Sequence, residues 1–216
     1  MIQMRVDMGV LQMEVAGRPD GAKVDGMDSW LDRLGVEAIA DPEFFITEEQ
    51  KSEIDREFSQ YCYRRLCWLA LYKFDQAILD ADHTLMLMDF IRIYSDEPDW
   101  VASHEQHRPF VVFQRTEAIA LGTLEEGRPQ VAIDEINLGL SELEQISQEW
   151  PDNEEIADEI NEMISELREL RSWIQGHYSL TATLQQQLDE AIASERYEVA
   201  AELRDLIKRG QTTEDR

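Results

Sequence analysis

The sequence has few cysteines and no long apolar run. Two of its 216 residues are cysteine, Cys62 and Cys67. They lie five apart in a helical pattern and point in different directions, so a disulfide-stabilised scaffold is excluded and a reducing cytoplasm is expected. No apolar run approaches the roughly 18–20 residues that span a membrane. The first residues also lack the continuous apolar core of a signal peptide.

Basic residues are scarce as well. The chain has 20 lysines and arginines against 46 aspartates and glutamates, which gives a formal charge of −26. Such a charge repels a phosphate backbone and opposes direct binding of nucleic acid. The sequence contains no P-loop, dinucleotide fingerprint, nucleophile elbow or zinc-protease motif. We therefore predict no catalytic residue, no metal, no cofactor and no enzymatic activity.

The first segment, residues 1–45, carries the clear strand signal. Apolar and polar residues alternate on both sides of Gly9, which indicates either a tight hairpin or one bulged strand. A two-stranded ribbon needs a helix beneath it. Residues 27–34 form a short helix in this interpretation, ended by the glycine that follows. Arg18 and Asp20 lie in a Gly/Pro turn cluster and could form a functional surface or only a structural turn.

The second segment, residues 46–150, contains two stretches in which one helix ends and another begins. They are Trp68–Ile78 and Thr123–Ile133. This arrangement resembles the tetratricopeptide repeat, a pair of antiparallel helices. The resemblance implies that Ala77 and Ala132 are the small residues where the helices of each pair approach one another.

The spacing of the two stretches departs from a plain repeat array. Ala77 and Ala132 lie 55 residues apart, whereas the repeat period is about 34. The excess falls near Pro98, where we predict a polar loop. Thr47 and Gln50 have the spacing of a capping box at the start of the segment's first helix, which we expect to run to about Tyr72.

The third segment, residues 151–216, is predicted to hold one long helix followed by a helical hairpin. Apolar residues from Leu180 through Leu184 and Leu188 to Ile192 form one helical face. Ser194–Arg196 then interrupts the pattern, and a second amphipathic helix begins at Tyr197. Two helices of this length bury too little apolar surface to be stable alone, so we expect the hairpin to dock onto a partner.

The second arm of this hairpin carries a recognisable motif. It reads Tyr-Glu-Val-Ala-Ala-Glu-Leu-Arg-Asp over residues 197–205, with Ile207 after it. This segment resembles the UVR motif, a helical hairpin of the B and C subunits of the bacterial excision-repair nuclease and of some protease-chaperone adaptors. The resemblance implies pairing with a second hairpin in a four-helix arrangement. The partner-binding residues it implies are Leu184, Leu188, Tyr197, Glu198, Ala200, Ala201, Leu203, Arg204, Asp205 and Ile207.

The functional hypothesis is a mainly α-helical, cytoplasmic, non-enzymatic adaptor. Its C-terminal hairpin would bind a protein partner or a second copy of the chain, with a link to DNA repair. One alternative is a stress or proteolysis regulator like the chaperone adaptors, although those often use cysteine clusters that this chain lacks. Another is a metal-dependent enzyme that uses His104 and His107, which could be two metal ligands or ordinary surface histidines.

Four arginines stand out against the acidic background. They could line a groove for an acidic peptide, or they could form internal ion pairs with acids such as Asp80, Asp82 or Glu117. These groove candidates are Arg64, Arg65, Arg108 and Arg115.

Overall fold

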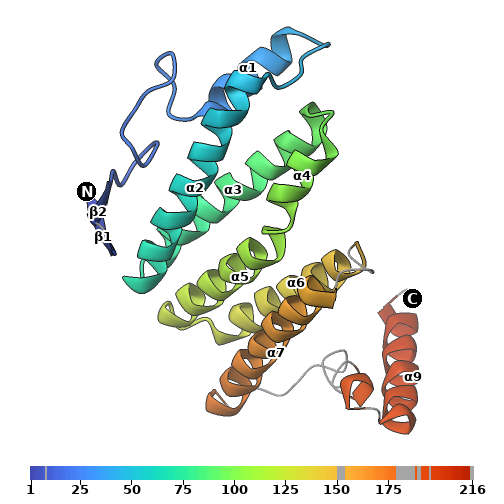
Figure 1. Ribbon diagram of the computed structural model, residues 1–216. Helices are drawn as coiled ribbons and strands as arrows, with labels where there is room; N and C mark the ends of the chain where they lie inside the picture. The colour runs from blue at the N-terminus through green and yellow to red at the C-terminus, as the bar shows by residue number, and fades with distance from the viewer. Residues whose placement is uncertain (8, 150–153, 179–187, 189–190, 195, 215–216) are drawn as a thin grey trace. The chain divides into compact units, whose positions relative to one another are not determined.

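The computed structural model describes the backbone of residues 1–7, 9–149, 154–178, 188, 191–194 and 196–214, and the side chains of these residues apart from 154 and 206–214. The chain is mainly helical with a small two-stranded sheet at its N-terminus, as predicted (Figure 1). It divides into two compact units, Met1–Leu170 and Arg171–Arg216. The predicted division of the chain at residues 45 and 150 stays a prediction.

Two helical hairpins make up most of the first unit. In one, α2 (Glu48–Ala70) leads through a short turn into α3 (Phe74–Tyr94). In the other, α5 (Arg108–Glu125) leads into α6 (Pro129–Ser147). The hairpins are joined side by side because α3 packs against α5 (Figure 1).

The local signals for these hairpins are present in the structure. The side chain of Thr47 accepts from the backbone N–H of Gln50, and the side chain of Gln50 accepts from the backbone N–H of Thr47. This is the predicted capping box. Ala77 and Ala132 are fully buried. The relationship to tetratricopeptide repeats stays a prediction.

The connection between the hairpins contains a helix where we predicted a polar loop. This helix, α4, spans Pro98–Glu105 and has its proline in the first turn. Proline is favoured there because the first N–H groups of a helix have no intrahelical acceptor. The predicted loop is wrong because Pro98 begins a helix and does not break one.

The N-terminal ribbon is a tight hairpin, so the bulged-strand alternative is wrong. Its strands, β1 (Ile2–Val6) and β2 (Gly9–Met13), pair antiparallel with Ile2 opposite Met13. These two side chains are buried in one cluster with residues of α2, α3 and α5. The hairpins thus supply the support that a two-stranded ribbon needs.

The first helix, α1 (Trp30–Ala40), is longer than predicted. Ser29 caps its start by accepting from the backbone N–H of Asp32. Gly35 lies inside the helix and does not end it, because a glycine in a helix interior costs only about 1 kcal/mol relative to alanine. The long helix of the third predicted segment is present as α7 (Glu154–His177). No helix in the described part of the chain is long and apolar enough to cross a membrane.

Candidate functional site

The described residues of the C-terminal hairpin form an apolar cluster. The second arm of the hairpin is α9 (Tyr197–Glu214), and residues 191–193 are helical in its first arm. Ala191, Ala200 and Leu203 are buried together, and the partly buried Leu188 packs against them. Ala191 and Ala200 come from opposite arms and have small side chains, so the arms lie close together at this point.

The turn between the arms is closed by Arg196. Its backbone N–H donates to the carbonyl of Ala191 at 2.8 Å, and its carbonyl accepts from the N–H of Ala200 at 3.0 Å. Its side-chain Nε donates to Oγ of Ser194 at 2.9 Å. The predicted interruption of the helical pattern at Ser194–Arg196 is therefore where the described backbone turns.

Three large apolar side chains of this hairpin are left uncovered. The exposed fractions are 52% for Ile192, 67% for Tyr197 and 41% for Val199. Ile192 directly follows the buried Ala191, and Val199 directly precedes the buried Ala200. The hairpin therefore has apolar surface beyond what its own core covers.

This hairpin coincides with a known motif. Residues 179–211 match the family model described as the UvrB/uvrC motif, UVR. We name this element the UVR hairpin after the motif that it matches. A search of curated proteins and a search of solved structures each found no match. The sequence resemblance at the C-terminus is confirmed by the family model.

The predicted partner-binding residues of the UVR hairpin fall into three groups. Ala200 and Leu203 are buried in the hairpin's own core, with Leu188 beside them, so they are not a free seam. Leu184 and the side chain of Ile207 lie outside the described residues. The exposed predicted residues are Tyr197, Glu198, Ala201, Arg204 and Asp205.

Sequence reasoning missed Val199 and Ile192 as surface candidates. The signal was present, since Val199 directly follows Tyr197–Glu198 and is a large apolar residue outside the buried positions. Among the charged residues, Arg204 Nε lies 3.8 Å from Asp205 Oδ1, and both side chains are exposed.

Arg64 and Arg65 are both buried, and their guanidinium groups make hydrogen bonds within the chain. Arg64 donates to Asp80 through Nε at 2.9 Å and Nη2 at 2.7 Å, and both side chains are buried. Arg65 is also buried and donates to Gln114 Oε1 at 2.8 Å and Thr84 Oγ1 at 3.0 Å. Both guanidinium groups serve contacts between helices.

Arg108 and Arg115 also form pairs within the chain. Arg108 Nη2 lies 2.9 Å from Asp89 Oδ1, and Arg115 Nε lies 2.5 Å from Asp82 Oδ1. Both pairs join α5 to α3. The alternative of internal ion pairs thus describes these arginines, and their charges are already compensated.

His104 and His107 are placed differently from each other. His104 is buried, with Nδ1 3.0 Å from the carbonyl of Trp100 and Nε2 3.1 Å from Asp55 Oδ1. His107 is exposed, and partial burial together with the nearby His104 lowers the pKa of His107 below its usual value. Among the described residues, no three His, Cys, Asp or Glu side chains are grouped so that they could hold a metal ion.

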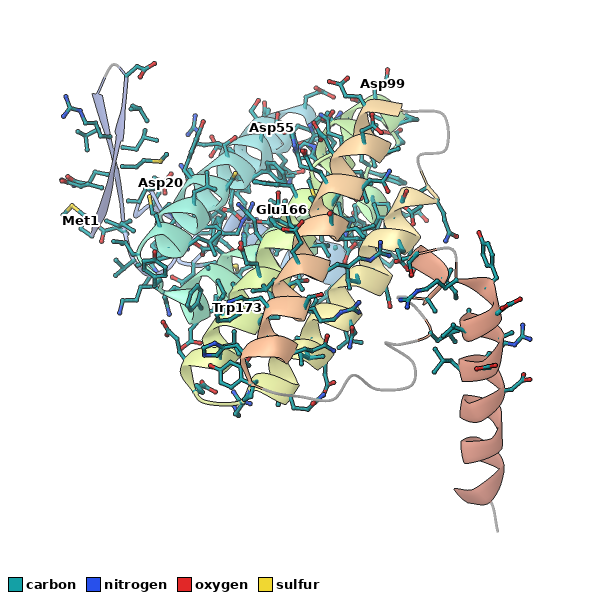
Figure 2. All side chains as sticks on the ribbon, turned by 90° about the horizontal axis from the view of Figure 1, so that it is seen from below. Met1, Asp20, Asp55, Asp99, Glu166 and Trp173 are labelled. Carbon is teal, nitrogen blue, oxygen red and sulfur yellow. The ribbon has the colours of Figure 1, made fainter. Side chains whose placement is uncertain are left out.

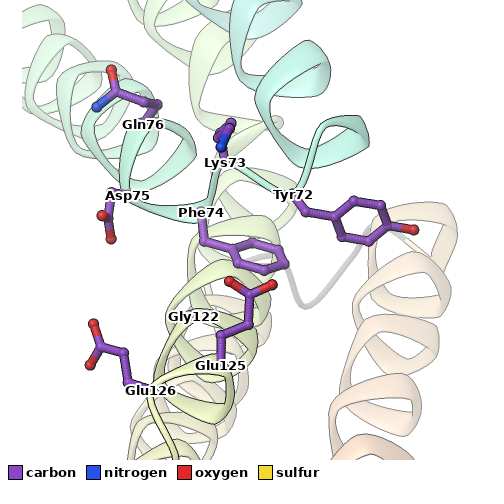
Figure 3. A pocket seen from close by; sticks show the side chains of 8 residues that line it. All are labelled: Tyr72, Lys73, Phe74, Asp75, Gln76, Gly122, Glu125 and Glu126. Atoms are coloured by element: carbon purple, nitrogen blue, oxygen red, sulfur yellow. The ribbon is translucent and has the colours of Figure 1, made fainter.

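An open pocket of about 490 Å³ lies beside the turn between α2 and α3 (Figure 3). Tyr72 in this turn has φ of 55°, in the left-handed region, so α2 ends at Ala70 and not at Tyr72 as predicted. The Tyr72 ring points away from Asp75 and into solvent (Figure 3). Three exposed carboxylates line the rest of this pocket, and we assign no ligand to it.

Proposed function

We propose that this chain is a non-enzymatic, cytoplasmic adaptor that binds a protein partner through its UVR hairpin. The observation that carries the proposal is the exposure of Tyr197, Val199 and Ile192 inside the segment that matches the motif. Exposed large apolar residues that lie together on a small element are typical of an interaction site.

The energetics of the hairpin support association. Two short helices are marginal in water on their own, because most helical stability in proteins comes from tertiary packing. Burial of one large apolar side chain stabilises by about 1.5–3 kcal/mol. Covering Tyr197 and Val199 with a partner would therefore stabilise the hairpin and the complex together.

The partner that we propose is a matching hairpin on another chain, of the kind found in excision-repair subunits. The basis for this class is the family match at residues 179–211. The exposed charges of Glu198, Arg204 and Asp205 would set the register of pairing, since charges at the rim of an interface select partners more than they add affinity. The net charge of −26 favours a protein partner over nucleic acid.

The test is a pull-down from cell extract with the immobilised full-length chain. Tyr197→Asp and Val199→Asp should each lose the captured partner, because each buries a charge in the proposed interface. Glu202→Ala, an exposed polar position on the same helix, is the matched control and should keep it. Capture that survives both aspartate substitutions would contradict the proposal. Leu203→Asp is a poorer test because Leu203 is buried within the hairpin.

A further inference from the structure

Two adjoining pockets are lined by residues of the first unit. One, of about 160 Å³, is lined by Phe58, Cys62 and Tyr63 of α2 among others. The other, of about 300 Å³, is lined by residues of α5 and α7. His107 and Phe110, at the start of α5, line both pockets. The two pockets share these residues and are taken together here as the α5 groove, with lining residues from α2, α5 and α7.

Exposed aromatic side chains mark this groove as a contact surface. Tyr63 is 43% exposed and Phe110 is 40% exposed. Ile156 and Met163 of α7 add apolar side chains that are partly exposed. Enclosed small-molecule sites typically have volumes of about 300–1,000 Å³. The two open pockets are at or below the lower end of that range, so they fit single side chains of an extended peptide better than a whole small molecule.

The groove and its edge along α5 and α7 are acidic. Glu159 lines the larger pocket. Farther along the same helices, burial and the nearby carboxylate of Glu166 raise the pKa of Glu117 above its usual value. Figure 2 shows Glu166 on α7. No ion pair joins Glu117, Glu159 or Glu166 to another of the described side chains.

Three arginines near the groove make contacts within the chain. Arg65, the guanidinium that borders the smaller pocket, is buried and hydrogen-bonded to Gln114 and Thr84. Arg108 and Arg115 are paired with acids on α3. Of the carboxylate and the guanidinium in the lining, Glu159 is exposed to a ligand and Arg65 is buried.

We propose that the α5 groove binds an extended, basic segment of a partner protein that carries an apolar anchor. The anchor would pack on Phe110, and lysine or arginine side chains would face Glu159 and the Glu117–Glu166 edge. A second copy of this chain is a poor occupant, because two chains of charge −26 repel each other. The proposal concerns a different surface from the UVR hairpin and does not depend on it.

The test is selection of random twelve-residue peptides, displayed on phage, against the immobilised full-length protein. Enriched peptides should contain more lysine and arginine than aspartate and glutamate, together with at least one large apolar residue. Synthetic copies should bind at least tenfold more weakly to Glu159→Lys and to Phe110→Ser. Circular dichroism would verify that both variants keep the helical content of the wild type.

Two matched variants separate this site from general attraction to an acidic protein and from the hairpin. Glu142→Lys makes the same charge change at an exposed position on α6 and should alter affinity less than twofold. Tyr197→Asp should leave peptide binding unchanged. No enrichment, enrichment of acidic peptides, or equal loss with Glu159→Lys and Glu142→Lys would overturn the proposal. A wild-type dimer that Phe110→Ser dissociates would also overturn it, because the occupant would then be a second copy.

Discussion

Arg64 and Asp80 form a bidentate pair inside the first unit, with both side chains almost completely buried. The same guanidinium donates through Nη1 to the backbone carbonyls of Glu14 at 3.0 Å and Gly17 at 2.7 Å. Arg64 of α2 therefore binds α3 through the Asp80 carboxylate. It binds the N-terminal segment through two backbone carbonyl groups of that segment. This contact accounts for the ordered docking of a segment that has little apolar surface of its own.

Asp80→Ala should be strongly destabilising. It would leave the buried Arg64 charge uncompensated, which typically costs about 3–5 kcal/mol. Denaturant unfolding followed by circular dichroism would measure the loss. Asp82→Ala is the matched control, because Asp82 pairs with Arg115 in a partly exposed position and such pairs contribute about 0–1 kcal/mol. Equal losses in the two variants would contradict this account of the pair.

Glu57→Ala should release the first helix. The Glu57 carboxylate is fully buried and accepts from the backbone N–H groups of Trp30 at 2.7 Å and Leu31 at 3.2 Å. It also lies 3.0 Å from His83 Nε2. Hydrogen bonds to a charged group contribute about 1.5–3 kcal/mol each. Hydrogen exchange should show loss of protection in α1 while α5 and α6 keep theirs, and unchanged protection in α1 would count against this role.

Tyr72→Gly should stabilise the protein. Tyr72 has φ of 55° immediately after α2, a conformation that glycine adopts without the steric cost of a side chain. We expect a gain of about 1 kcal/mol in the free energy of unfolding. The neighbouring Leu71→Gly is the control, since Leu71 has φ of −96° and should gain nothing. Thermal unfolding of both variants would decide, and a lower melting temperature for Tyr72→Gly than for the wild type would refute the prediction.

Glu117 should make stability depend on pH. Burial, with a smaller effect of Glu166, raises the pKa of Glu117 above its usual 4.5. A carboxyl group with a higher pKa in the folded state holds its proton more tightly when folded. The stabilisation of the folded state by protonated Glu117 is therefore fully present below the unfolded-state pKa. It is lost as the pH rises through the folded-state pKa.

Glutamine at position 117 cannot ionise, so Glu117→Gln should remove the loss of stability that occurs as the pH rises. The variant should be more stable than the wild type at pH 7, and the difference should shrink towards pH 4. Denaturant midpoints at the two pH values would measure it. Glu142→Gln, an exposed position on α6, should show little difference at either pH. A constant gain for Glu117→Gln at both pH values would show that the carboxylate is not the cause.

The sequence predicted best where a short-range rule decides the structure. The capping box at Thr47 and Gln50 and the alternation around Gly9 each depend on neighbouring residues, and both are present. It failed where one residue type serves two purposes. Pro98 could break or begin a helix, and Gly35 could end or interrupt one.

The roles of charged residues could not be predicted from sequence in the same way. Whether Arg65 faces a groove or a core depends on Gln114, 49 residues away, which supplies a buried acceptor. The exposed carboxylate of the α5 groove, Glu159, lies on α7, so it reaches the groove only because α7 packs near α5. For the UVR hairpin, the sequence motif located the site. Which of its residues are buried within the hairpin and which are exposed became clear only from the structure, in which Ala200 and Leu203 pack together.

The most direct test of the account is sedimentation velocity of the full-length chain, alone and mixed with the partner that the pull-down recovers. We predict a complex with the wild type and with Glu202→Ala, and no complex with Tyr197→Asp or Val199→Asp. A complex that forms equally with all four proteins would show that the exposed apolar residues of the UVR hairpin do not mediate binding.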